Sequence, residues 1–186
     1  MSKKFSLTKT SKEHFGTTLF QIKAEMSFGN VEKGELGGYI EKEENLSQEG
    51  DAWVFGDVRV FGNARVYGDA RVYGDAWVSG DAEVYGDAMV FGDAKVYGNV
   101  RVFGDAEVSG DAEVFGDAKV YGDAWVFGNA RVYGDAWVFG NARVYGKIKI
   151  LAGFFFGYRY KKEEIKYVQI DDDLELIYKG EGKYEK

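Results

Sequence analysis

The sequence predicts an all-β protein, a single-stranded parallel β-helix with triangular coils and a β-rich cap at each end. Two periodicities predict it. Glycine recurs at every sixth position from Gly50 to Gly146, and valine does so sixteen times in a row from Val54 to Val144. Short fixed periods of this kind are typical of solenoids. We expect an N-terminal cap and lead-in at residues 1–49, the β-helix at 50–149 and the C-terminal cap at 150–186.

The repeat unit reads Gly-Asp-Ala-x-Val-aromatic, where x is variable. Its Val, Ala and Gly residues have even numbers, whereas its Asp, Asn, aromatic and x residues have odd ones. Successive side chains of a strand point to opposite faces, so we expect valine and alanine to face inward and the aromatic and x residues to face outward. Gly-Asp and Gly-Asn tolerate left-handed backbone and predict a corner in each unit. Three such sides make one coil and enclose a narrow apolar interior.

Composition limits the classes of function. The chain has 186 residues and no cysteine, which excludes disulfides and thiolate metal sites and fits a reducing compartment. It contains no run of 18 apolar residues, so we expect a cytoplasmic protein without membrane contact. The net charge is −7, and residues 50–146 hold all of the net acidity. We therefore expect no direct binding to nucleic acid, which depends on clustered Lys and Arg.

The outward aromatic residues are the main candidates for binding. The residue after each repeat valine is Phe or Tyr in all units but two, which have Ser79 and Ser109. An 18-residue coil places five of these rings in one column: Tyr67, Tyr85, Phe103, Tyr121 and Phe139. The tryptophans at the x position are Trp53, Trp77, Trp125 and Trp137. Stacked rings stabilise strand pairing, but exposed aromatic stripes also mark interfaces. We interpret them as surfaces for a homo-oligomer or a host protein partner.

The repeat resembles the hexapeptide-repeat proteins of bacteria and bacteriophages, which are left-handed parallel β-helices. The segment QIKAEMSFGNVEKGELGGYIEKEENLSQEG, which runs directly into the repeats, is similar to the lead-in of acetyltransferase-like prophage proteins. The resemblance implies a left-handed coil. It also implies that an enzyme of this family would use a histidine in a cleft between subunits, with acyl-coenzyme A along the coils.

Catalytic and metal-binding motifs are weak in this chain. His14 is the single histidine, and it precedes the lead-in segment. The period of six does not fit the nine-residue calcium β-roll, and no phosphate-binding GxxxxGK[ST] motif occurs. We therefore assign no catalytic residue and expect no cofactor and no metal site. Stacked corner aspartates still leave weak binding of divalent cations open.

The sequence thus predicts a non-catalytic interaction or scaffold protein that self-associates through its outward aromatic stripes. Two alternatives remain. A phage-encoded inhibitor could use the acidic rod as a nucleic-acid decoy, and its binding would weaken steeply with salt. A hexapeptide acyltransferase would bind coenzyme A and lose its activity in His14→Ala.

Overall fold

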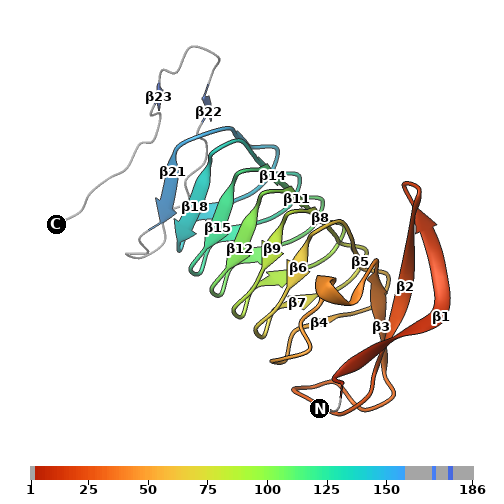
Figure 1. Cartoon of the computed structure of the whole chain (residues 1–186). Helices are drawn as coiled ribbons and strands as arrows, with labels where there is room; N and C mark the ends of the chain where they lie inside the picture. Colours follow the sequence, from red (N-terminus) through yellow and green to blue (C-terminus); the bar gives the residue numbers. More distant parts are fainter. Residues whose placement is uncertain (1–2, 158–168, 171–175, 178–186) are drawn as a thin grey trace.

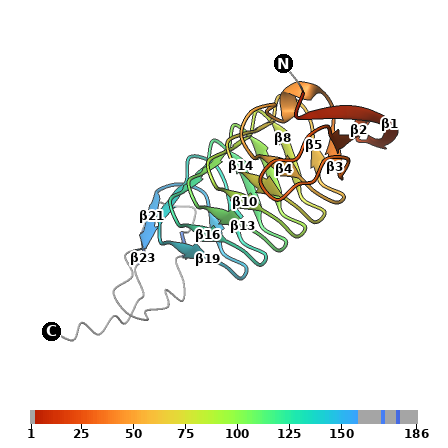
Figure 2. The same cartoon turned by 90° about the horizontal axis from the view of Figure 1, so that it is seen from below.

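The computed structural model describes residues 3–157, 169–170 and 176–177, and it confirms the all-β fold (Figure 1). Parallel strands stack into three sheets that wrap around one axis, so that the repeats form a rod (Figure 2). Within the described residues the helical content is one short 3-10 turn, η1 (Glu43–Asn45). The rod is a β-solenoid.

Each side of the rod is one sheet, named here after its first repeat strand. The β4 face holds β4 (Trp53–Val54), β7 (Arg71–Val72), β10 (Met89–Val90), β13 (Glu107–Val108), β16 (Trp125–Val126) and β19 (Arg143–Val144). The β5 face holds β3 (Leu36–Ile40), β5 (Arg59–Val60), β8 (Trp77–Gly80), β11 (Lys95–Gly98), β14 (Glu113–Gly116), β17 (Arg131–Val132) and β20 (Lys149–Ile150). The β6 face holds β6 (Arg65–Val66), β9 (Glu83–Val84), β12 (Arg101–Phe103), β15 (Lys119–Tyr121), β18 (Trp137–Gly140) and β21 (Phe154–Gly157).

The strands pair at the predicted interval, with each strand bonded to the strand that lies three repeat units along the chain. Val96, for example, lies between Val78 and Val114 in adjacent coils. Every repeat valine and alanine from Ala52 to Val138 is completely buried, which confirms the predicted inward parity. Burial of these columns supplies the apolar surface that stabilises the rod.

The corners require glycine for two reasons. Gly80 has a φ of 71° and Gly98 a φ of 88°, in the left-handed region that favours glycine. In addition, a Cβ atom on Gly80 would lie 2.8 Å from the backbone nitrogen of Gly98 in the next coil. The stacked corners are therefore too close for any side chain at this position.

The solenoid extends beyond the glycine repeats at both ends. Ile40 of β3 pairs in parallel with Val60, and Leu46 bridges Val66, so the first coil is slightly longer than three repeat units. At the other end Val138 pairs with Phe155, and the last coil is slightly shorter than three units. Parallel pairing thus begins within the segment expected to be the N-terminal cap, and the coil length changes only near the ends of the rod.

A hairpin extends the sheet of the β5 face at its N-terminal end. It consists of β1 (Phe5–His14) and β2 (Thr17–Ala24), and β2 pairs antiparallel with β3, so the hairpin continues that sheet (Figure 1). Towards the C-terminus β22 (Gln169–Ile170) pairs antiparallel with β23 (Leu176–Ile177). Most of the C-terminal cap expected at 150–186 lies outside the described residues.

Candidate functional site

The β6 face carries an uninterrupted stack of aromatic rings. The centroid distances along Tyr67, Tyr85, Phe103, Tyr121 and Phe139 are 4.8, 5.0, 4.9 and 5.1 Å, and adjacent planes differ by 4° or less. This confirms the predicted column. Phe156 of β21 adds a sixth ring, 5.7 Å from Phe139, which the sequence did not predict because the coil there is shorter than the regular repeat.

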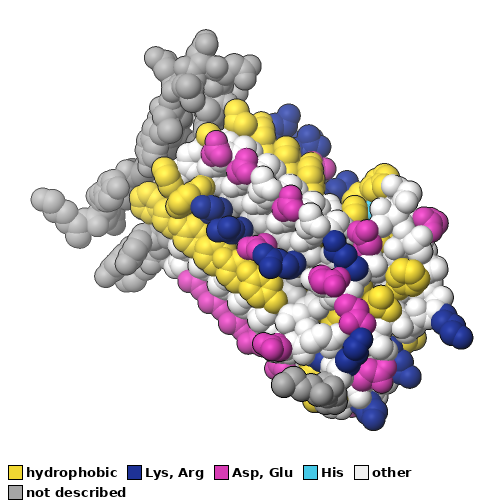
Figure 3. All heavy atoms as spheres, viewed as in Figure 1, with side chains coloured by type: hydrophobic (Ala, Val, Ile, Leu, Met, Phe, Trp, Pro, Cys, Tyr) yellow, Lys and Arg dark blue, Asp and Glu magenta, His cyan; other side chains and the backbone are white. Residues whose placement is uncertain are grey.

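Charged rows flank this stack on both sides. The x residues that precede the rings along the β6 face are Arg65, Glu83, Arg101, Lys119 and Trp137, and the corner residues that follow them are Asp69, Asp87, Asp105, Asp123 and Asn141. Figure 3 shows the hydrophobic stripe between Lys and Arg side chains on one side and acidic side chains on the other. The face thus has a mainly basic row, an aromatic row and an acidic row.

The phenols of Tyr67 and Tyr85 in this stack have raised pKa values. Burial is the largest cause for both phenols; the Glu83 carboxylate also raises each pKa, whereas the Arg101 guanidinium lowers it. Tyr67 and Tyr85 therefore contribute apolar area and hydroxyl hydrogen-bonding groups but no charge to the aromatic row.

The other two faces have broken columns. On the β5 face Tyr97, Phe115 and Tyr133 stack at 5.0 and 4.9 Å, but Ser79 separates them from Phe61. On the β4 face Ser109 interrupts the column between its two stacked pairs, Tyr73–Phe91 at 5.3 Å and Phe127–Tyr145 at 5.0 Å. The β6 face is the side on which the described rings form a continuous surface.

Trp53 corrects the expectation that all four tryptophans are outward binding residues. Its indole is completely buried, packed edge-on against Phe5 at 6.3 Å and Phe28 at 5.4 Å. The side chain does leave the coil outward, as the parity predicts, but the N-terminal segment then covers it. Trp53 is a core residue of the cap and is not available to a partner.

The remaining tryptophans lie on three different faces. Trp77 on the β5 face contacts the hairpin tip through His14 and Phe15, with centroid distances of 4.5 and 5.4 Å. Trp125 on the β4 face is 37% exposed, and the Arg143 guanidinium lies 4.7 Å from its ring centroid. On the β6 face, the Lys119 ammonium lies 4.0 Å from the ring centroid of Trp137. The tryptophans therefore do not form one common patch.

His14 lies in an aromatic environment rather than in a cleft. Its imidazole contacts Phe61 at 5.3 Å as well as Trp77, and its buried Nε2 has no hydrogen-bond partner among the described residues. Burial lowers its pKa, and the nearby Arg59 and Lys12 lower it further. The imidazole is thus kept neutral and anchors the hairpin tip.

Two hollows lie near the N-terminal end of the β6 face. One, of about 520 Å³, follows the polar corner and is lined by residues that include Lys42, Asn63 and Arg101. The other, of about 530 Å³, lies against Leu46, Ser47 and Tyr67. His14 lines neither of them. The sequence did not predict either hollow, because both depend on residues 42–48, which precede the regular repeats.

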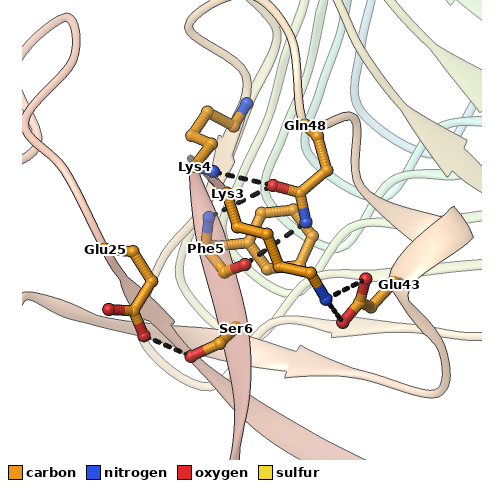
Figure 4. A network of polar contacts seen from close by, with 7 residues as sticks. All are labelled: Lys3, Lys4, Phe5, Ser6, Glu25, Glu43 and Gln48. Atoms are coloured by element: carbon orange, nitrogen blue, oxygen red, sulfur yellow. Dashed lines mark hydrogen bonds and ion pairs between the residues drawn. The ribbon is translucent and has the colours of Figure 1, made fainter. Parts of the chain in front are cut away.

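A polar network holds the N-terminal cap on the rod, and this network was also not predicted. The buried Lys4 ammonium donates hydrogen bonds to the carbonyl oxygens of Glu49, Gly50 and Ala52, at 3.3, 3.1 and 3.0 Å. Burial lowers the pKa of Lys4 to about 8. Figure 4 shows its neighbour Gln48 bonded to the backbone of Lys4 and Phe5.

In the part of the chain that the structure describes, His, Asp and Glu side chains do not gather in groups of three that could hold a metal ion. Among the same residues, no helix is long and apolar enough to cross a membrane.

The fold and its columns define the chain as a β-solenoid repeat protein. Comparison with protein families agrees: the model of the YdcK β-solenoid repeat matches residues 64–80 and 124–138. Both stretches lie in the repeats and each spans strands of more than one face. No curated protein matched the chain.

Proposed function

We propose that this protein is a non-catalytic scaffold that self-associates through the β6 face. The observation that supports the proposal is the unbroken stack from Tyr67 to Phe156, because the rings present a straight apolar stripe along the rod. Apolar stripes of this length are usually covered by another protein surface. The stack also needs no rearrangement before binding, which favours association.

The charged rows favour one arrangement of two rods. In a parallel face-to-face pair, the twofold axis runs along the ring column, so the basic row of each copy faces the acidic row of the other. In an antiparallel pair, like rows face each other, and charge repulsion disfavours this arrangement. Lys119 and Asp123 lie at equal distances from Tyr121 along the chain, one on each side of it. In the parallel pair Lys119 of one copy therefore faces Asp123 of the other.

Light scattering of the purified protein tests the proposal. We expect a concentration-dependent dimer of the 20.8 kDa chain that weakens as salt is raised, because part of the attraction is between charges. Lys119→Glu and Asp123→Lys should each weaken the dimer by at least about tenfold, and the double variant should restore it. Both changes should preserve the fold, because Glu83 and Lys147 occupy the same repeat positions naturally.

Lys95→Glu is the matched control, since Lys95 occupies the same repeat position on the β5 face. It should leave the dimer unchanged. A protein that stays monomeric at all concentrations would overturn the proposal, as would a double variant no stronger than the single ones.

The corner aspartates support a second candidate, the phage-encoded nucleic-acid decoy. Asp69, Asp87, Asp105 and Asp123 form one exposed row, and Asp57, Asp75, Asp93 and Asp111 form another. Such regular acidic rows would attract a basic nucleic-acid-binding protein of the host. Binding of DNA-binding proteins from host lysate to the immobilised rod, displaced by moderate salt and by competing DNA, would favour this function over the scaffold.

A further inference from the structure

At the N-terminal end of the β6 ring stack, one position of the column has no aromatic ring; we call this position the vacancy. Tyr67 stacks on Tyr85 on one side, but on its other side the preceding coil supplies Ser47. Leu46 bridges Val66 in parallel, and the Ser47 amide donates to the Val66 carbonyl oxygen at 2.9 Å. Ser47 thus holds the position at which a ring would continue the stack.

The hollow of about 530 Å³ lies at this vacancy. Leu46, Val66 and Tyr67 supply its apolar lining, and Ser47, Gln48 and Glu44 supply polar groups. Ligand sites typically combine these features at this size: apolar walls with a few polar groups that orient the ligand. We propose that this hollow binds a small planar aromatic molecule carrying a positive charge, whose ring stacks on the open face of Tyr67.

The walls of the hollow are held in place before any ligand binds. The Gln48 side-chain oxygen accepts from the backbone amides of Lys4 and Phe5, at 2.8 and 3.3 Å, and its amide donates to the Phe5 carbonyl oxygen at 3.3 Å (Figure 4). Glu43 is held by the Lys3 ammonium at 2.6 and 2.9 Å. A preformed site avoids the cost of ordering loops on binding.

The charges around the hollow select a cation. Two carboxylates, Glu43 and Glu44, and one guanidinium, that of Arg65, line the hollow. Glu43 is paired with Lys3, and Arg65 shares the Glu83 carboxylate with Arg101, which lies outside the lining. Glu44 is exposed and forms no ion pair within residues 3–157, so it leaves one carboxylate uncompensated at the rim. A positive group on the ligand would approach this carboxylate, and a cationic ring would also be attracted to the face of Tyr67.

The same chain already fills a neighbouring vacancy with a ring from outside the column. Ser79 interrupts the β5 column next to Phe61, and the imidazole of His14 from the hairpin lies against Phe61 and Trp77 at that point. At this serine gap the rod thus packs against a ring from another segment, whereas at Ser109 no described ring does so. At Ser47 no described segment supplies one.

Tryptamine, an indole with an ammonium group, is a suitable probe, and indole-3-acetate is its anionic counterpart. Titration followed by amide NMR shifts tests the site directly. Leu46, Ser47 and Gln48 belong to a unique segment, so their signals differ from those of the repeats. We expect saturable shifts at these residues with tryptamine and much weaker binding of indole-3-acetate.

Variants of the aromatic position provide the controls. Tyr67→Ser should weaken tryptamine binding by about tenfold or more, since one stacking partner is lost. Phe115→Ser removes an equivalent ring from the β5 column and should leave binding unchanged. Ser47→Tyr should fill the vacancy and abolish binding. Serine is native at Ser79 and Ser109, so both serine variants should fold.

Two results would overturn the assignment. One is the absence of saturable shifts at Ser47 and Gln48 up to the solubility limit of tryptamine. The other is equal weakening by Tyr67→Ser and Phe115→Ser, which would mean that the probe coats the aromatic columns without preference. Tyr67 also belongs to the stack proposed for self-association, so both tests are read on Lys119→Glu protein at a concentration at which light scattering shows a monomer.

Discussion

The imidazole of His14 lies edge-on to the indole of Trp77, with ring centroids 4.5 Å apart and planes at 78°. This contact joins the tip of the N-terminal hairpin to strand β8 of the β5 face, although the two residues are far apart in the sequence. It explains how a hairpin that extends the sheet edge also remains attached to the side of the rod.

Docking of the hairpin should depend on pH. Burial first, and then Arg59 and Lys12, hold the folded pKa of His14 below its usual value of 6.5. The unfolded chain therefore binds the proton more tightly, and His14 contributes its full stability above about pH 6.5 and loses it as the pH falls through the lowered folded pKa. Trp77 fluorescence should report undocking on acidification. In His14→Phe this change should be absent, and equal acid sensitivity in both proteins would contradict the prediction.

Replacing the two serines of the aromatic columns with phenylalanine should affect the stability of the rod differently. Ser109→Phe places a ring between Phe91 and Phe127 on the β4 face and should stabilise the rod by about 0.5–1 kcal/mol. Ser79→Phe places a ring where the hairpin tip docks, so it should displace His14 and give no gain. Thermal unfolding of the two variants provides the comparison, and an equal gain from both would show that the hairpin does not need the gap.

Trp53 and Trp125 should differ sharply on truncation, although they occupy the same repeat position on the β4 face. Trp53 is completely buried under Phe5 and Phe28, so Trp53→Ala should cost about 3–5 kcal/mol. Trp125 is 37% exposed, and Trp125→Ala should cost under about 1 kcal/mol. Chemical denaturation measures both. Similar losses would mean that the N-terminal segment does not cover Trp53 in solution.

Alanine substitutions at two corner glycines should distinguish the cost of backbone strain from the cost of crowding between coils. At Gly56 the nearest atom to an added Cβ is 3.5 Å away, so Gly56→Ala should cost only the left-handed strain of about 1–2 kcal/mol. At Gly80 the added Cβ would meet the Gly98 nitrogen at 2.8 Å, and the cost of Gly80→Ala should exceed about 3 kcal/mol. Denaturant midpoints of the two proteins test this, and equal values would show that the coils can move apart at the corner.

The repeats could be predicted in detail from the sequence. The period of six and the alternation of inward and outward residues can be read within a single unit, and every unit has the same buried and exposed positions. The interior valine and alanine columns therefore followed from spacing and parity. The coil of three repeat units, and with it the column from Tyr67 to Phe139, also required the argument that three sides enclose these side chains; the structure confirms all of them.

The ends of the rod could not be predicted in this way, because there the contacts join segments without a common period. The sequence identified Trp53 as outward, but only the tertiary structure brings Phe5 and Phe28 over it. The longer coil before Val66 likewise hid the alignment of Ser47 with the ring column. The sequence by itself thus determined the rod and its outward columns, whereas long-range packing of the N-terminal segment decided which outward residues are covered, which are free and where the stack is left open.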